Sequence, residues 1–273
     1  MKTNISAIAV LVAALFITSC GKNETPDPLP TVVKEWNIAL SAKNEIPAPA
    51  GRNESGTVTL QLLSNNSLKY TINVTGLAGT DALVAAHIHT GDVINNGGVI
   101  LGLNPTFAGA MAMGTILNLR TSFVDSLKND ANELYFNVHS TQVASGLIRG
   151  QLNTKIEMAA DVVLSGANEV PAVTTTATGI ALLRLTANKK LYSKITVTSL
   201  EAGDALSASH IHKAAAGVNG PIIVGVYANA AEFGTVKVIT VDDMQFASLK
   251  AEAIYVNVHS TSKPAGIIRG QIR

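Results

Sequence analysis

The feature that most constrains the fold of this 273-residue chain is an internal duplication marked by histidines. All six histidines fall within two short patterns, and each pattern occurs twice. The first is His-Ile-His, at 87–89 and 210–212. The second is Tyr-x-Asn-Val-His-Ser-Thr, at 135–141 and 255–261. A repeat of about 120 residues is far too long for a solenoid unit, so the pattern predicts two copies of one domain.

Within each copy, short segments of alternating apolar and polar residues are separated by turns rich in Gly, Asn and Ser, which predicts antiparallel strands. In the first copy we expect strands at 37–42, 56–63, 68–74, 83–89, 99–103, 114–119, 133–139 and 147–152. One helix is expected at 121–129, capped by a Thr or Ser side chain, and its counterpart at 241–251. Strands without alternating helices indicate an all-β fold with two tandem antiparallel sandwiches, or else small closed barrels.

The N-terminal segment predicts export and a lipid anchor. Residues 5–17 form an apolar or small run that is too short to span a membrane and is typical of a signal peptide. The ending Ile17-Thr18-Ser19-Cys20 resembles a bacterial lipobox, in which the cysteine is lipidated. We therefore predict a signal peptide at 1–20, a proline-rich tether at 21–35, domains at 36–152 and 158–273, and a linker at 153–157.

Composition narrows the classes of partner. The chain has 20 basic and 19 acidic residues. Lys2 is the one charged residue among the first twenty, so removal of that segment leaves equal numbers of basic and acidic residues. A balanced charge gives no electrostatic reason to expect a nucleic acid as partner. Cys20 is the single cysteine, so the domains contain no disulfide and must be held by packing.

The histidines are candidate metal ligands. Side chains two apart on a strand share a face, so His87 and His89 point the same way. A third histidine from a neighbouring strand would complete a three-nitrogen site for copper or zinc, with an open fourth position. The two candidate sets and the acidic residues that could support them are His87, His89, His139; His210, His212, His259; and Glu45, Asp81, Asp92, Glu169, Asp204. The alternative is a structural role, in which the histidines hydrogen-bond to the long loop that follows His-Ile-His.

Two arginines are the other candidates. Arg149 and Arg269 each stand ten residues after the last histidine of their copy. Each could bind an anion, but we favour an ion pair with Glu45 or Glu169, respectively, that ties the first strand to the last. No nucleophile elbow, phosphate-binding loop, dinucleotide fingerprint or His-Glu-x-x-His motif occurs, so the sequence favours a protein that is not an enzyme.

The motifs together resemble the chordin-type domain, CHRD. They are Leu-Ser-x-x-Asn-Glu-x-Pro, His-Ile-His, Tyr-x-Asn-Val-His-Ser-Thr and Gly-x-Ile-Arg-Gly-Gln, and they recur in the family's order over 36–152 and 158–273. The resemblance implies an extracellular all-β module with an immunoglobulin-like or related sandwich, and it implies no established enzymatic activity. The family occurs in the animal protein chordin and in many bacterial envelope proteins.

A weaker resemblance is to copper-zinc superoxide dismutase, a Greek-key sandwich that also places His-x-His and a later histidine on copper. Each copy here lacks a further histidine that could serve as a bridging or zinc ligand, and it also lacks a disulfide pair. At most a copper-only site remains. The leading hypothesis is a lipid-anchored protein of the bacterial cell envelope, at the periplasmic or surface face of the outer membrane. Its CHRD domains would be a binding or structural module for a protein or glycan. The alternative is a metal-binding or redox protein that uses three histidines per domain.

Overall fold

The computed structural model describes residues 28–273. The predicted signal peptide, Cys20 and most of the predicted tether lie outside these residues. Within the described part of the chain, neither helix is long and apolar enough to span a membrane.

The first domain contains eight strands and one α-helix. The helix is α1 (Thr121–Lys128), and a 3-10 turn η1 (Ala42–Asn44) follows the first strand. The strands are β1 (Val32–Ser41), β2 (Ser55–Leu63), β3 (Leu68–Thr75), β4 (Leu83–Thr90), β5 (Val99–Gly102), β6 (Met111–Ile116), β7 (Leu134–Ser140) and β8 (Ile148–Gln151).

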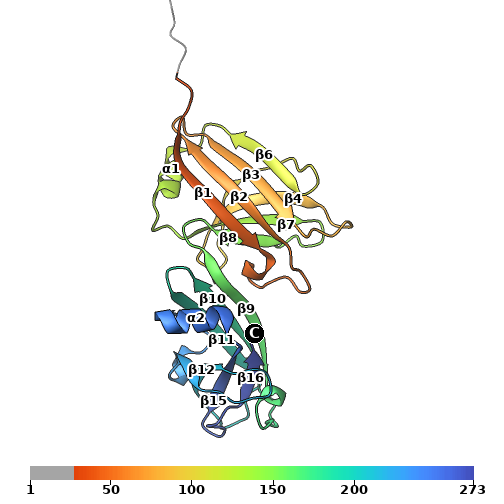
Figure 1. Cartoon of the computed structure of the whole chain (residues 1–273), viewed down its shortest axis with the longest axis vertical. Helices are drawn as coiled ribbons and strands as arrows, with labels where there is room; N and C mark the ends of the chain where they lie inside the picture. The colour runs from red at the N-terminus through yellow and green to blue at the C-terminus, as the bar shows by residue number, and fades with distance from the viewer. Residues whose placement is uncertain (1–27) are drawn as a thin grey trace, which may run out of the picture. The chain divides into compact units, whose positions relative to one another are not determined.

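The strands follow the order β5-β4-β7-β8-β1-β2-β3-β6, and every pairing is antiparallel. The joint between β8 and β1 is a single residue pair, Ser41 with Arg149, whereas β1 and β2 pair along nine positions. The sheet folds at this weak joint. One layer holds β1, β2, β3 and β6, and the other holds β4, β5, β7 and β8 (Figure 1). The chain crosses between the layers after β3, β5 and β6, as in a Greek-key sandwich.

The core lies between the two layers because each strand turns one face inward. Along β2, Val58, Leu60 and Leu62 are fully buried, while the residues between them are partly exposed. On β7, Phe136 and Val138 enter the same core. This period-two alternation is what a strand with one apolar face requires.

The second domain repeats the arrangement, in the order β13-β12-β15-β16-β9-β10-β11-β14. Its helix is α2 (Asp243–Ala251), and its 3-10 turns are η2 (Gly166–Asn168) and η3 (Ala230–Glu232). Its strands are β9 (Ile156–Ser165), β10 (Thr178–Thr186), β11 (Lys190–Thr198), β12 (Leu206–Lys213), β13 (Ile222–Tyr227), β14 (Lys237–Thr240), β15 (Ile254–Ser260) and β16 (Ile268–Gln271). It has its own apolar core.

The predicted all-β fold with two tandem sandwiches and one short helix each is confirmed, with local differences. Strand β6 spans 111–116, where 114–119 was expected. Helix α1 begins after Arg120, which provides no side-chain cap, so the predicted Thr or Ser cap is wrong. Asp242 does cap α2 in a capping box: its carboxylate accepts a hydrogen bond from the Gln245 backbone N–H, and the Gln245 side-chain oxygen accepts one from the Asp242 backbone N–H. Strand β9 starts at Ile156, inside the predicted linker.

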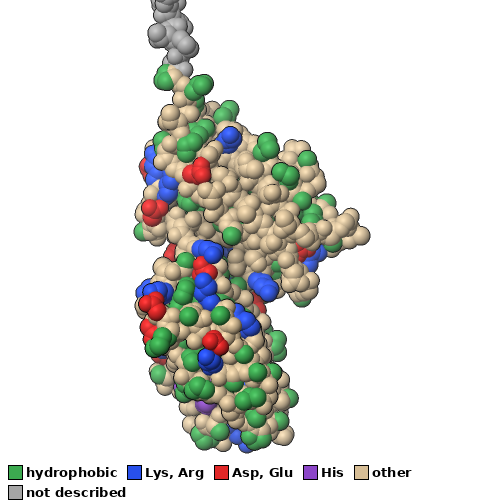
Figure 2. All heavy atoms as spheres, in the orientation of Figure 1, with side chains coloured by type: hydrophobic (Ala, Val, Ile, Leu, Met, Phe, Trp, Pro, Cys, Tyr) green, Lys and Arg blue, Asp and Glu red, His purple; other side chains and the backbone are tan. Residues whose placement is uncertain are grey.

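Charged side chains of both signs lie among one another on the face shown in Figure 2. This mixing agrees with the nearly equal numbers of acidic and basic residues. Little histidine is visible on that face. The histidines are instead half-buried or buried within each domain.

Candidate functional site

The three histidines of each domain come together on two neighbouring strands. Strand β4 pairs with β7, and this register places His87 opposite Asn137 and His139 opposite Ala85. His87 and His89 share one face of β4, as the alternation predicts. One nitrogen from each of His87, His89 and His139 lies within 4.8 Å of the others. The pairing of β12 with β15 gathers His210, His212 and His259 in the same way.

Hydrogen bonds assign the protons on the first-domain rings. His89 Nδ1 lies 3.0 Å from the Gly97 carbonyl oxygen, and His139 Nδ1 lies 2.9 Å from the Ala144 carbonyl oxygen. A carbonyl only accepts, so both Nδ1 atoms must carry the proton. The Nε2 atoms of His89 and His139 are therefore unprotonated in the neutral rings. His87 Nδ1 then donates to His139 Nε2, at 2.9 Å.

The second domain keeps this pattern. His212 Nδ1 donates to the Gly220 carbonyl at 2.9 Å, and His259 Nδ1 donates to the Pro264 carbonyl at 3.0 Å. His210 Nδ1 lies 3.0 Å from His259 Nε2. His212 Nε2 is buried and has no hydrogen-bond partner within residues 28–273. An unprotonated nitrogen therefore faces the centre of the cluster with nothing to bind.

The imidazoles are poor bases in this setting. Burial lowers the pKa of His87 and His89, and the neighbouring imidazoles of the cluster lower it further. For His210 burial is again the largest cause, followed by His259 and His212, and the pKa falls to about 4. These rings are thus neutral near pH 7, which is the state in which imidazole binds metal ions.

A stack of three side chains holds the second histidine of each pair. The rings of His89 and Tyr135 are nearly parallel, with centroids 4.6 Å apart. Arg149 places its guanidinium carbon 3.5 Å from the Tyr135 centroid. Strand β7 lies between β4 and β8, so the tyrosine ring lies between the other two groups. In the second domain the stack is Arg269, Tyr255 and His212, with distances of 3.3 Å and 4.7 Å.

The loop that follows β4 covers this face of the sheet. Arg149 donates to the carbonyls of Asp92 and Asn95 and to Asn96 Oδ1. Gln151 Nε2 donates to the Gly91 carbonyl. The loop buries Val93 and Ile94. Tyr135 and Asn137 are consequently buried, although their face of β7 points away from the apolar core.

The arginines therefore do not have the predicted role. Among the described residues, Arg149 forms no ion pair within 4.0 Å with Glu45, and Arg269 forms none with Glu169. Arg269 instead donates to the carbonyls of Ala215 and Val218 and to Asn219. The loop carbonyls have no strand or helix partner, and the arginine N–H groups donate to them instead. A guanidinium suits this role because it carries several donors on one planar group.

The two glutamates are buried next to glycines. Burial raises the pKa of Glu45 to about 7, and Arg149 and the Asn137 side chain only partly oppose this. Burial likewise raises the pKa of Glu169 to about 7 against the charge of Arg269. A Cβ atom at Gly146 would lie 2.6 Å from Glu45 Oε1. Gly146 also has a φ of 134°, so only glycine suits this contact.

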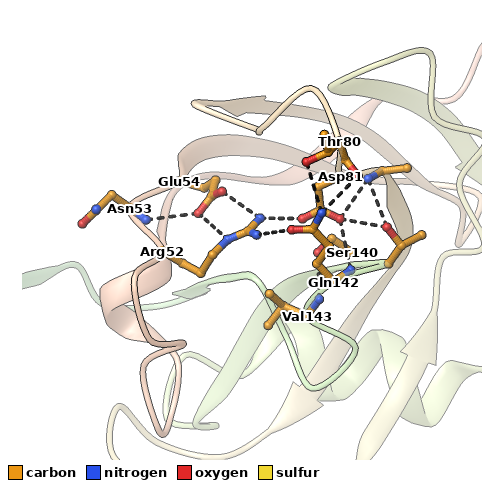
Figure 3. A network of polar contacts seen from close by, with 10 residues as sticks. Arg52, Asn53, Glu54, Thr80, Asp81, Ser140, Gln142 and Val143 are labelled. Atoms are coloured by element: carbon orange, nitrogen blue, oxygen red, sulfur yellow. Dashed lines mark hydrogen bonds and ion pairs between the residues drawn. The ribbon is translucent and has the colours of Figure 1, made fainter.

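Asp81 and Asp204 are not part of the histidine clusters. Asp81 binds Arg52 and, as Figure 3 shows, accepts hydrogen bonds from the loop that follows β7. Although burial opposes ionisation, hydrogen bonds from Ser140, Thr141 and Arg52 hold the pKa of Asp81 below its usual range. Asp204 binds the equivalent loop in the second domain. Both aspartates anchor the turn that carries the carbonyl acceptor of the third histidine.

Sequence reasoning missed Asn137 and Asn257. Asn137 Oδ1 lies 3.1 Å from His89 Nε2 and 3.1 Å from His139 Nε2. Asn257 lies opposite His210 in the register, as Asn137 lies opposite His87. The signal was present, because both copies carry asparagine two residues before the third histidine.

Comparisons with known proteins agree with the motifs. The family model described as CHRD domain matches twice, at residues 36–152 and 160–272. A search of curated proteins and a search of solved structures each gave no match. Two tandem CHRD domains suggest a binding or structural module. With matches over most of its length and the histidine patterns at equivalent places in both sandwiches, the chain belongs to the CHRD domain family.

Proposed function

We propose that each CHRD domain binds one transition-metal ion, zinc or copper, through its three histidines, in a lipid-anchored protein of the bacterial cell envelope. The observation that carries the proposal is that hydrogen-bond acceptors outnumber donors at the centre of each cluster. In the second domain, His212 Nε2 and Asn257 Oδ1 are buried acceptors without a donor. A buried acceptor without a partner is costly, and a cation would satisfy several at once.

The outer contacts of the histidines support the same function. Metal-binding histidines commonly donate their other ring N–H to a carbonyl or carboxylate, which fixes the tautomer and aims the free nitrogen. His89, His139, His212 and His259 all do so. Nitrogen ligands without thiolate suit zinc and copper, and zinc-to-imidazole bonds of about 2.0–2.1 Å require only small movements of rings already this close.

The metal content and the zinc and copper titration of the full-length protein, purified in detergent, test this function. We expect two ions per chain. A variant with His87→Ala, His89→Ala and His139→Ala should bind one ion, and so should the equivalent variant at His210, His212 and His259. Each triple variant is the matched control for the other. Absence of binding by the wild-type chain at micromolar metal, or two ions retained by either variant, would contradict the proposal.

The lipid anchor rests on Cys20 and the lipobox-like residues before it. Several acyl chains on one cysteine give durable membrane attachment, whereas one chain gives only marginal binding. We expect the wild-type protein in the membrane fraction of a bacterial host and Cys20→Ser in the soluble envelope fraction. Metabolic labelling with a fatty acid should mark only the wild type. Equal labelling of both proteins would disprove lipidation at Cys20.

A further inference from the structure

A fourth polar side chain faces each histidine cluster. In the first domain this is Asn137, whose Oδ1 atom lies 3.1 Å from the Nε2 atoms of both His89 and His139. These distances are ordinary for hydrogen bonds, yet neither nitrogen has a proton to share. Each ring already donates its Nδ1 proton to a backbone carbonyl. His139 Nε2 accepts the His87 proton, so without a cation the lone pairs of His89 Nε2 and Asn137 Oδ1 face each other with no proton between them.

The distances between the Asn137 oxygen and the histidine nitrogens are slightly shorter than those between the ligands of one metal ion. Tetrahedral zinc with bonds of about 2.0–2.2 Å to nitrogen and oxygen keeps its ligands about 3.3–3.5 Å apart. The two Asn137 distances are 0.2 Å or more shorter than this, and the His87–His139 distance of 2.9 Å is shorter again. An ion entering the cluster would need to spread these atoms only slightly, after displacing the proton between His87 and His139.

A buried carboxylate orients the amide. The Asn137 side chain interacts with the Glu45 carboxylate and opposes the rise in its pKa. Only the amide nitrogen can donate to a carboxylate, so the amide oxygen turns toward the histidines. Gly146 allows the carboxylate to approach, because a Cβ there would lie 3.0 Å from Asn137 Nδ2 and nearer still to Glu45. Glu169 has the same position against Gly266 in the second domain.

We propose that Asn137 and Asn257 supply the fourth donor atom of their sites, with Glu45 as the positioning carboxylate in the first domain. This inference rests on the proposed metal-binding function and deepens it. Three imidazole nitrogens and one amide oxygen favour a divalent ion, zinc or copper(II), because soft copper(I) prefers sulfur ligands and gains little from an amide oxygen.

The second domain offers the sharper test, because Asn257 Oδ1 has no hydrogen-bond partner within residues 28–273. Leucine has nearly the same shape and removes an unsatisfied polar group, so Asn257→Leu should unfold at the same temperature as the wild type or higher when metal is removed. Its affinity for zinc, measured against a competing chelator in a chain that also carries His87→Ala and His139→Ala, should fall by about tenfold or more. Its affinity for copper(I) should change little.

Two further variants complete the experiment. Asn257→Asp keeps an oxygen ligand and should retain zinc binding. Asn37→Leu, at an exposed amide on β1 that hydrogen-bonds to Glu35 and Thr59 at the surface, should leave zinc binding unchanged and shift the unfolding temperature only slightly. Unchanged zinc affinity in Asn257→Leu would overturn the inference and leave the histidine site intact. A lower unfolding temperature of metal-free Asn257→Leu would also overturn it, since the amide would then have a structural role. If the parent chain binds no zinc, the proposed function itself fails.

Discussion

Arg149→Ala should lower the free energy of unfolding of the first domain by about 4 kcal/mol or more, enough to leave it unfolded at 37 °C. The Arg149 side chain has an exposed fraction of 0%. Its removal leaves the carbonyls of Asp92 and Asn95 without their donor and opens a cavity beside Tyr135. The two hydrogen bonds are partly buried, so each loss costs up to the about 1–3 kcal/mol of a fully buried unpaired carbonyl, and the cavity adds to that cost.

Urea unfolding followed by circular dichroism measures the change. Arg269→Ala should have a similar effect on the second domain, because its guanidinium binds the carbonyls of Ala215 and Val218. The control is Arg120→Ala. Arg120 is exposed and makes no cap bond, so its loss should change stability by less than about 0.5 kcal/mol. If Arg149→Ala were as stable as this control, the loop would not depend on the guanidinium.

The role of Arg149 shows where sequence reasoning stops. The strands, their inward faces and the shared face of His87 and His89 follow from period-two alternation, which is a local property. The partners of Arg149 are backbone carbonyls, and every residue has one, so no sequence pattern distinguishes them. The sequence favours an acidic partner such as Glu45 because a charged side chain, unlike a backbone carbonyl, distinguishes one residue from another.

The histidine cluster was predictable only in part. The duplication singled out the six histidines, but which strand lies beside β4 depends on long-range pairing. Period-two alternation puts Tyr135 and Asn137 on the face opposite Phe136 and Val138, which enter the core. It did not reveal that this face is covered, because the covering loop has no periodicity and buries few apolar residues, among them Val93 and Ile94. Asn137 was therefore assigned no role.

Glu45→Gln and Glu169→Gln should each stabilise the metal-free protein by up to about 3 kcal/mol at pH 8.5 and have little effect at pH 4.5. The folded-state pKa of both glutamates is about 7, raised by burial from an ordinary value of 4.5. A raised pKa means that the folded state holds the proton more tightly. The stability from each protonated glutamate is therefore complete below pH 4.5 and is lost as the pH rises through 7. Glutamine stays neutral and avoids this loss.

The measurement is the free energy of unfolding of each variant minus that of the wild type, in a chelating buffer, at several pH values from 4.5 to 8.5. Taking the difference removes the opposite contribution of His210, whose lowered pKa costs stability as the pH falls from 6.5 toward 4. Glu252→Gln is the control, because Glu252 forms only a surface ion pair with Lys213 and should change stability by less than about 1 kcal/mol at either extreme.

The same experiment decides between two roles for Glu45. If Glu45 and Arg149 formed an ion pair, as the sequence suggested, Glu45→Gln would leave a buried cation unpaired and would destabilise the protein at pH 8.5. If the role of the carboxylate is to orient Asn137 toward a metal ion, its ionised form lowers the stability of the metal-free protein. Metal binding offsets this loss of stability. Stabilisation of the metal-free variant together with weaker zinc binding supports the second role, and loss of stability at high pH would restore the first.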